Sequence, residues 1–369
     1  MKGSRVRGVN THGRGLFIIC GEIIMSGEKN FRIFRIILFG AVFLLILTGL
    51  SALSDPVKWF NDNRVQDRNA RLTELMKQEP YTIDVFNMGD SLSLASLSPM
   101  EMWRNDGYTS FNIGADGIRM PEIYYAVVEA TKNQDVRYLF FETLPLFRYE
   151  KNQDKQMLLS QPLYHRFTFL KYHNIWKTLA EGRGIKTYHK GYLVNREVQE
   201  YKGDPDYLDQ ELKGVKTEIP RFNRIWFERL KKYCDERNIT IIFYSAPSPK
   251  NYNWKRLRSI SAFAGEMGIE YLELNGRSGE IGLDWKTDSN DQGDHMNLDG
   301  VKKMTAFFGE ELKKRGDITD HRQDPAYSSW NEELTAYDQL VDEMEGMSYF
   351  LINEQIKKER LEEKEKNKQ

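Results

Sequence analysis

The sequence predicts an α/β fold built on a parallel sheet. Short apolar runs alternate with amphipathic helical segments along most of residues 80–316. Strands that alternate with helices form parallel sheets, with helices covering both faces. Two further observations are a long uncharged run near the N-terminus and a helical pattern after residue 331. We therefore expect an α/β domain between one N-terminal transmembrane helix and a helical C-terminal extension.

Five strands and five main helices are expected in the domain. The strands are TIDVFNM (82–88), YTSFNIG (108–114), VRYLFFET (136–143), ITIIFYS (239–245) and IEYLEL (269–274). The helices are LASLSPMEMW (94–103), PEIYYAVVEATKNQ (121–134), FNRIWFERLKKYCDERN (222–238), WKRLRSISAFAGEMG (254–268) and GVKKMTAFFGEELKKRG (300–316). Pro121 suits the first turn of its helix, because that turn needs no backbone donor there.

Residues 146–219 interrupt this alternation and are rich in Tyr, Lys and His. A segment of this length is too long for a routine loop. We expect it to form a lid or substrate-binding subdomain over the carboxyl ends of the strands, where open α/β sheets bind ligands. Its aromatic side chains would suit sugar rings, and the alternative is that they pack inside the protein; they are Tyr164, Phe167, Tyr172, Trp176, Tyr188 and Tyr192.

The C-terminal extension, residues 317–369, contains a further helical pattern. Five apolar side chains fall on one helical face, namely Leu334, Tyr337, Leu340, Val341 and Met344. The final stretch IKKERLEEKEKNKQ (356–369) is strongly charged, and we expect it to be a solvated helix.

The run from Ile36 to Leu53 has no charged residue and is close to the length that crosses a bilayer. Basic residues precede it, which predicts that residues 1–35 are cytoplasmic and that the chain from about residue 55 lies outside. We expect an anchor at 36–54 and a helical linker at 55–79. The sequence Ala52-Leu53-Ser54 also fits a signal cleavage site, but the run is longer than most signal cores, so a retained anchor is favoured.

Composition excludes some classes of function. The formal net charge is -1, and because residues 1–54 are basic, the remainder is mildly acidic and lacks the basic surface that nucleic-acid binding needs. Cys20 and Cys234 form no disulfide framework, and Cys234 is expected to be a small buried side chain. No His/Cys cluster has metal-ligand spacing and the GADG sequence at 114–117 lacks dinucleotide-binding context, so neither a metal nor a cofactor is predicted.

The sequence Gly89-Asp90-Ser91 stands where the first strand ends and a helix begins. The first amide groups of a helix have no intrahelical acceptor and favour negative charge. Ser91 on this turn is a candidate nucleophile. The alternative is that Ser91 or Ser93 only caps the helix.

A serine nucleophile needs an imidazole base, and the base needs a carboxylate that fixes its tautomer. Among the six histidines, only His295 lies in a loop that follows the last strand and opens a helix, at Gly300. A parallel sheet would bring this loop to the same edge as Ser91. Asp291 and Asp294 are both close enough in sequence to orient the ring, and the sequence leaves the choice open.

Two more groups are expected at this edge. Gly114 follows the second strand and has no Cβ, so its N–H can approach a carbonyl oxygen closely and serve as an oxyanion donor. Thr143 ends the third strand and could supply a hydroxyl.

The strand that ends in GDS, the strand that ends in N-x-G and the late Asp/His loop together resemble the SGNH (GDSL-type) hydrolase family. The likeness is greater to its membrane-anchored branch, which includes alginate O-acetylation and teichoic-acid D-alanylation proteins. It covers about residues 80–145 and 220–316. The usual third-block asparagine is absent from FFETLP, and Gln292 stands where the family has Asp three residues before His.

The resemblance implies a flavodoxin-like three-layer sandwich. It implies that Ser91 is the nucleophile and His295 the base. The amides of Ser91 and Gly114 would form the oxyanion hole, while Asp90, Asn112 and Thr143 would assist oxyanion or substrate binding.

The expected function is therefore that of an extracytoplasmic, membrane-anchored acyl (O-acetyl) transferase or esterase. It would act on a cell-surface polysaccharide through an acyl-Ser91 intermediate, and by resemblance a membrane-embedded acyltransferase would donate the acyl group. One alternative is an anchored esterase or lipase for small esters. Another is a non-catalytic polysaccharide-binding scaffold with a degenerate site.

Overall fold

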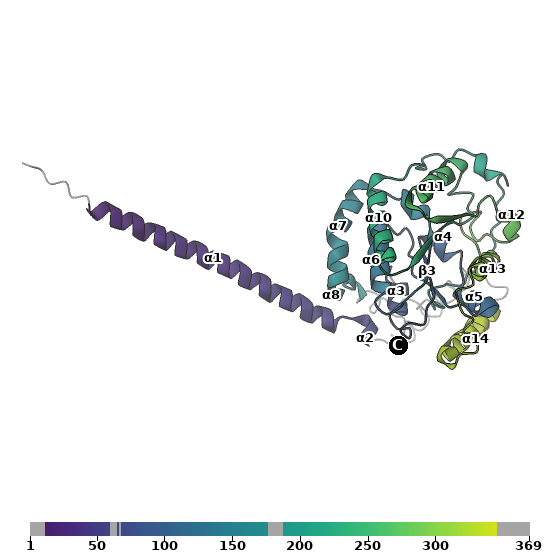
Figure 1. Ribbon diagram of the computed structural model, residues 1–369, viewed down its shortest axis with the longest axis horizontal. Coiled ribbons are helices and arrows are strands. Elements are labelled where there is room, and N and C mark those ends of the chain that lie inside the picture. Colours follow the sequence, from purple (N-terminus) through teal and green to yellow (C-terminus); the bar gives the residue numbers. More distant parts are fainter. Residues whose placement is uncertain (1–11, 60–64, 66–67, 176–186, 345–369) are drawn as a thin grey trace, which may run out of the picture.

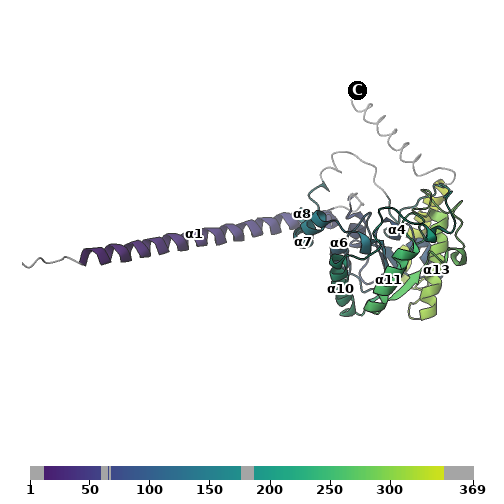
Figure 2. The same cartoon turned by 90° about the horizontal axis from the view of Figure 1, so that it is seen from above.

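A long N-terminal helix leads into an α/β domain (Figures 1 and 2). The computed structural model describes residues 12–59, 65, 68–175 and 187–344, with side chains from residue 30 onward. Helix α1 covers His12–Leu53 and is followed by the short α2, Pro56–Trp59. The N-terminal helix, the α/β domain and the C-terminal helix follow one another in the predicted order.

The sheet has five parallel strands in the order β2-β1-β3-β4-β5. The strands are β1 (Val85–Met88), β2 (Ser110–Asn112), β3 (Tyr138–Glu142), β4 (Thr240–Ser245) and β5 (Glu270–Glu273). This is the flavodoxin-like strand order, in which ligands bind outside the carboxyl ends of the strands. The predicted fold class is confirmed.

Helices cover both faces of the sheet. Those on one face include α6 (Met120–Ala130), α10 (Arg221–Asp235) and α11 (Trp254–Met267). Those on the other include α5 (Pro99–Asp106), α13 (Leu298–Arg315) and α14 (Ser328–Glu343). The shorter described segments are α3 (Ala70–Leu75), α4 (Ser91–Leu94), α8 (Thr168–Lys171), α12 (Ser278–Ile281), η1 (Leu144–Phe147), η2 (Tyr207–Asp209) and η3 (Pro325–Tyr327).

The strands are apolar on both faces because both faces are covered. In β3, Phe141 contacts Phe227 of α10 on one side of the sheet, with ring centroids 5.6 Å apart. The preceding residue, Phe140, contacts Phe308 of α13 on the other side, at 4.9 Å. Successive strand side chains point to opposite faces, so this pair joins the sheet to both helical layers.

One predicted helix is divided. The segment 94–103 lies partly in α4 and partly in α5, because Ser98 has an extended backbone and caps the helix that Pro99 begins. In the predicted linker, α2 and α3 are formed, and residues 60–64 and 66–67 lie outside the described part of the chain.

The insert does not form a single lid. Its first part folds into α7, Lys151–Arg166, which lies beside α6, and α8, which contacts α1. Its later part reaches the loop of His295, where the Gln199 amide donates to Ser289 O at 2.8 Å. The expectation of one subdomain over the strand ends is therefore wrong for α7 and α8, because these helices bury their inner sides against α6 and α1.

Most of the insert's described aromatic side chains are unavailable to a sugar ring. Phe167, Tyr172, Tyr188 and Tyr192 are buried, and Tyr164 is half-buried. Trp176 lies outside the described residues. The interpretation of these rings as a sugar-binding surface is therefore wrong for the four buried ones, which pack inside the protein.

Helix α14 packs on the domain through the predicted apolar face. Tyr337 is buried and its hydroxyl donates to Glu101 Oε1 at 3.0 Å, while Met344 is also buried. The charged stretch 356–369 lies outside the described residues. Cys234 is buried in α10, as expected.

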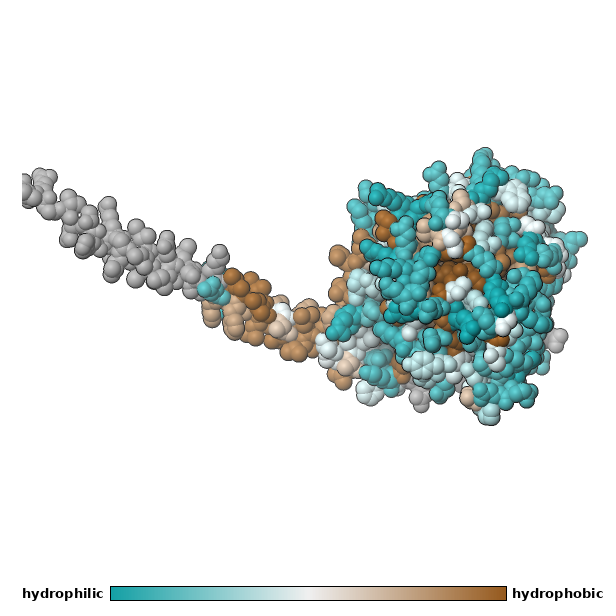
Figure 3. All heavy atoms as spheres, in the orientation of Figure 1, coloured by the Kyte–Doolittle hydropathy of each residue, from teal (hydrophilic) through white to brown (hydrophobic). Residues whose placement is uncertain are grey.

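The stretch Asn30–Trp59 is long and apolar enough to cross a membrane, and its most apolar part has no buried residue. Figure 3 shows that most of its surface is apolar. Membrane anchors and signal sequences can both have this length and composition, so these two properties do not distinguish them.

Candidate active site

The turn after β1 presents Ser91 at the carboxyl edge of the sheet. Asp90 has an extended backbone and caps α4, where its carboxylate accepts from the Leu92 amide at 3.1 Å. The Ser93 hydroxyl is buried and donates to Asp90 O at 2.7 Å. Asp90 supplies the side-chain cap, so the hydroxyl of Ser91, the first residue of the helix, is left for another partner.

That partner is His295. The Ser91 Oγ lies 2.7 Å from His295 Nε2, and His295 Nδ1 lies 2.6 Å from Asp291 Oδ2. The structure thus brings together a hydroxyl, an imidazole and a carboxylate from loops 204 residues apart. This is the hydrogen-bonded order that a serine nucleophile, its base and the orienting acid require.

Asp291, not Asp294, is bonded to the ring. Asp291 Oδ1 also accepts from the backbone amides of His295 at 2.7 Å and Asp294 at 3.1 Å. Asp294 Oδ1 is 4.0 Å from His295 Nδ1 and accepts instead from the side chain of Asn251. The geometry therefore selects Asp291 from the two carboxylates that the sequence left open.

The loop reaches this shape through a left-handed turn. Gln292 has φ 64° and Gly293 has φ 88°, which folds Asp291 back toward His295. Ser289 Oγ accepts from the Gly293 amide at 2.6 Å and holds the turn. Immediately after the loop, Asn297 caps α13 by accepting from the amides of Asp299 and Gly300.

The surroundings of His295 raise its pKa. Burial lowers the pKa of His295, but the hydrogen bond to Asp291 and the charges of Asp294, Asp291 and Asp90 outweigh burial and raise the pKa above the ordinary 6.5. Burial raises the pKa of Asp291, but hydrogen bonds from His295 outweigh it and lower the pKa overall. Asp291 is thus stabilised as a carboxylate, the form that orients an imidazolium.

Two backbone amides are available for an oxyanion. The Ile113 and Ala115 amides donate to Asn87 O at 2.9 Å and Gly89 O at 3.2 Å. Within the described part of the chain, the amides of Ser91 and Gly114 have no acceptor. A Cβ at Gly114 would lie 2.4 Å from Gly89 O, so only glycine allows this close approach of the two loops.

The other predicted binding residues are placed inside the protein. All three are buried: Asp90 pairs with Arg148, Asn112 donates to Leu97 O at 2.8 Å, and the Thr143 hydroxyl lies 2.7 Å from Ser245 Oγ. Because their polar atoms have internal partners, we assign them structural roles in place of the predicted oxyanion or substrate contacts.

The structure places two charged side chains next to the site: Arg148, which the sequence did not single out, and Glu142, which the sequence places with Thr143 at the end of the third strand. Arg148 Nη2 lies 2.6 Å from Asp90 Oδ2. Glu142, at the end of β3, accepts from the Leu144 amide at 3.0 Å and from the Tyr252 hydroxyl. Burial, followed by the charge of Asp90, raises the pKa of Glu142 well above its ordinary value. A Glu at the end of a buried strand was a visible signal for Glu142, whereas Arg148 had none.

Asp291, Asp294 and His295 have ligand atoms within 4.8 Å of one another. Both ring nitrogens of His295 are already hydrogen-bonded, to Ser91 and Asp291. The hydrogen bonds that join Ser91, His295 and Asp291 therefore explain why these ligand atoms lie close together.

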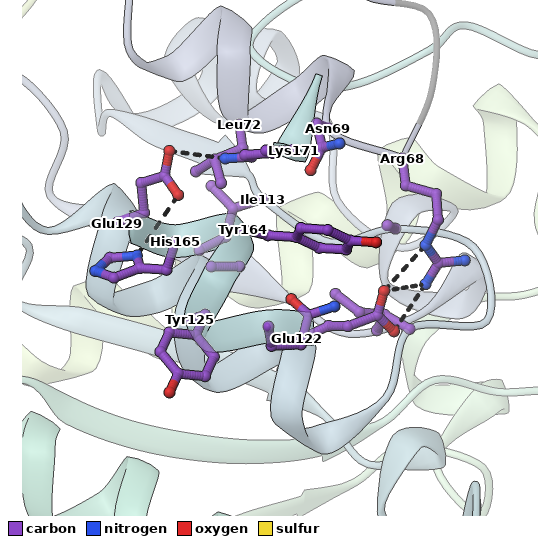
Figure 4. A pocket seen from close by; sticks show the side chains of 14 residues that line it. Arg68, Asn69, Leu72, Ile113, Glu122, Tyr125, Glu129, Tyr164, His165 and Lys171 are labelled. Carbon is purple, nitrogen blue, oxygen red and sulfur yellow. Dashed lines mark hydrogen bonds and ion pairs between the residues drawn. The ribbon is translucent and has the colours of Figure 1, made fainter. Parts of the chain in front are cut away.

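A cavity of about 130 Å³ lies behind the Gly114 loop, between α3, α6, α7 and α8 (Figure 4). Ile113 and Ala115, which flank Gly114, form part of its wall. Its charged groups are paired with each other: Arg68 with Glu122 at 2.9 Å, and Lys171 with Glu129 at 2.7 Å. The cavity is thus a partly polar space next to the proposed oxyanion donors.

Comparison with known proteins found similar chains among solved structures only. No family model and no curated protein matches it. Among solved structures it is similar to a candidate acylhydrolase from Bacteroides fragilis NCTC 9343, with 12% identity and a TM-score of 0.34, over 69% of this chain and 99% of that one. A GDSL-like lipase from Bacteroides thetaiotaomicron VPI-5482 gives 12% identity and a TM-score of 0.32, over 69% and 100%. The roles of the site residues therefore follow from the geometry of the site itself.

Proposed function

We propose that the protein is a serine-dependent acyl-transfer enzyme, an O-acyl transferase or esterase, with Ser91 as nucleophile. The observation that carries the proposal is the continuous hydrogen-bonded chain from Ser91 Oγ through His295 to Asp291. The two contacts in this chain measure 2.7 Å and 2.6 Å. The proposal accords with the resemblance of the sequence to SGNH hydrolases.

The proposed mechanism has two symmetrical halves. His295 Nε2 takes the Ser91 proton while Oγ attacks the ester carbonyl, and the amides of Ser91 and Gly114 stabilise the oxyanion. The tetrahedral intermediate collapses, His295 protonates the departing alcohol, and an acyl-Ser91 ester remains. In the second half, His295 deprotonates the accepting hydroxyl, of a sugar or of water, and that oxygen attacks the acyl carbonyl. The bond from the carbonyl carbon to Ser91 Oγ then breaks, and His295 returns the proton to Oγ.

We propose that the enzyme adds acyl groups to a cell-surface polysaccharide, or removes them from it, outside the cytoplasmic membrane. The apolar stretch Asn30–Trp59, the basic residues before it and the resemblance to the membrane-anchored branch support this location. A membrane-embedded acyltransferase would supply the acyl donor.

A second candidate is an anchored esterase for small esters. It is favoured by the burial of the insert aromatics, which removes one argument for a large carbohydrate ligand. The third alternative, a binding scaffold with a degenerate site, is opposed by the complete Ser91–His295–Asp291 arrangement.

The test is fluorophosphonate labelling of the full chain in detergent, with Ser91→Ala and His295→Ala variants. We expect the wild type to label at Ser91 and both variants to lose labelling. Ser261→Ala, at an exposed serine of α11, serves as the control and should label fully. Equal labelling of Ser91→Ala and wild type would overturn the catalytic proposal.

A second assay separates transferase from esterase. The full chain is given a chromogenic acetyl ester with and without an acetyl-accepting oligosaccharide. Acetylated oligosaccharide formed in a Ser91-dependent way supports the transferase, whereas release of acetate alone supports the esterase.

A further inference from the structure

Helix α7 presents an apolar face to solvent. Leu159 is 75% exposed, Leu163 is 47% exposed and Leu158 is 43% exposed. On its inner side, Asp154 is buried and its Oδ2 lies 2.8 Å from Arg119 Nη1. This ion pair fixes the rotation of the helix, so the leucines are held outward by the fold. Leucines held exposed in this way mark a surface that contacts a partner or a membrane.

The charges of α7 suit an anionic surface. Lys151, Lys155 and Arg166 are exposed along the helix. Asp154 is its only acidic residue and is neutralised inside the protein. An exposed face of leucines with basic residues is typical of helices that lie in a membrane interface.

Helix α7 is joined to the end of the proposed membrane anchor. The Thr168 hydroxyl, two residues after α7, donates to Ser51 O of α1 at 2.6 Å. The uncharged run Ile36–Leu53 spans about 27 Å at the α-helical rise, close to the thickness of the hydrocarbon core. Ser51 therefore lies near the outer boundary of that core. Trp59, 62% exposed, is the kind of residue found at the same level.

The arrangement of the helices agrees with this position. In two views, α7 lies on the side of the domain from which α1 leaves (Figures 1 and 2). Its axis runs across the direction of α1, as a helix parallel to the membrane would. Apolar surface is visible at this edge of the domain, next to α1 (Figure 3).

We propose that α7 is an interfacial helix that rests on the outer surface of the same bilayer that α1 crosses. Leu158, Leu159 and Leu163 enter the boundary between headgroups and acyl chains, and Lys151 and Lys155 meet lipid phosphates. The proposal rests on the proposed membrane anchor and is independent of the proposed catalysis.

The contact has a consequence for the site. The inner side of α7 contributes Gln161, Tyr164 and His165 to the cavity behind Gly114 (Figure 4). A helix that touches lipid on one side and lines this cavity on the other holds the candidate active site at a fixed, short height above the membrane. Substrates presented at the membrane surface would then reach it most readily.

The test is site-directed spin labelling of the full chain in vesicles of neutral and anionic phospholipid. Cys20→Ser provides the background, because Cys234 is buried and does not react. A label at Leu159→Cys should be several-fold more accessible to oxygen than to a water-soluble nickel complex. The matched control is Lys313→Cys, 64% exposed on α13 at the far side of the domain, which should show aqueous accessibility.

A label at Phe43→Cys, within the uncharged run, reports insertion of α1. An aqueous label at residue 159, with residue 43 immersed, would overturn the proposal. Immersion at 159 in native membranes but not in pure lipid vesicles would also overturn it, in favour of a protein partner. Replacing Leu163 by Glu should lift the label at 159 out of the lipid while residue 43 stays immersed.

Discussion

At His295 two aspartates act on one ring, and they act differently. Asp291 is hydrogen-bonded to Nδ1, whereas Asp294 contributes only its charge from 4.0 Å. Asp291→Asn should therefore lower the rate of ester hydrolysis by about 10³- to 10⁴-fold, because the ring loses the carboxylate that fixes its tautomer. Asp294→Asn should keep most of the activity. Equal losses in the two variants would contradict the assignment.

The pH dependence of the rate follows from the raised pKa of His295. Catalysis needs the neutral ring, so the rate should fall as pH drops through a value above 6.5. Asp294→Asn removes a charge that raises this pKa, so its acid limb should move to lower pH. The measurement is kcat/KM between pH 5 and 9 for both proteins. A shift to higher pH would have the wrong sign.

Gly114 is required by packing. A Cβ there would lie 2.4 Å from Gly89 O and 2.8 Å from Ser93 Oγ, so Gly114→Ala must push the two loops apart. We expect a loss of about 1–3 kcal/mol in the free energy of unfolding and loss of fluorophosphonate labelling. Gly265→Ala, in α11 with nothing within 4 Å, is the control and should be neutral or slightly stabilising. Denaturant unfolding measures both, and equal stability of the two variants would contradict the packing argument.

At the scale of elements, β3 ends in a buried carboxyl group, that of Glu142. This group accepts a hydrogen bond from Tyr252, which lies just before α11. Burial, followed by the charge of Asp90, raises the pKa of Glu142 well above its ordinary value, so folding favours the protonated form of its carboxyl group. The stability it contributes is present below its ordinary pKa of 4.5 and is lost as pH rises toward the raised folded value. Glu142→Gln cannot ionise, so its melting temperature relative to that of the wild type should increase as pH rises from 5 to 9. Glu228→Gln, exposed on α10, is the control; a constant difference for Glu142→Gln across this range would refute the argument.

In the insert, residues 146–219, the helices pack against parts of the chain outside the insert: α7 against α6, and α8 against α1. Local periodicity did not predict α7, because its outward face mixes leucines with lysines and its inward face includes a buried aspartate. Its position follows from contacts with α6 and Arg119, which lie earlier in the chain, and with α8, which follows it directly. The segment thus became two elements with different neighbours instead of one lid.

At the scale of the molecule, α1 is both a membrane-length helix and a packing partner of the domain. The bonds of Thr168 and Phe169 to Ser51 would be lost if the chain were cleaved after Ser54 and the anchor removed. We therefore expect the mature protein in membranes to retain residues 36–54. Intact-mass measurement of the membrane fraction checks this, and a mature chain beginning near Asp55 would contradict it.

The sequence alone determined the five strands of the sheet and most of the helices that cover it, because buried strands and amphipathic helices have different periods. It also determined Ser91 and His295 as partners, because a parallel sheet brings its strand ends to one edge. Only the tertiary structure chose Asp291 over Asp294, because the choice depends on backbone angles at Gln292 and Gly293. The tertiary structure also decided that Asp90 pairs with Arg148 and that the leucines of α7 face outward. Both features depend on residues that are far apart in the sequence, so no local pattern predicts them.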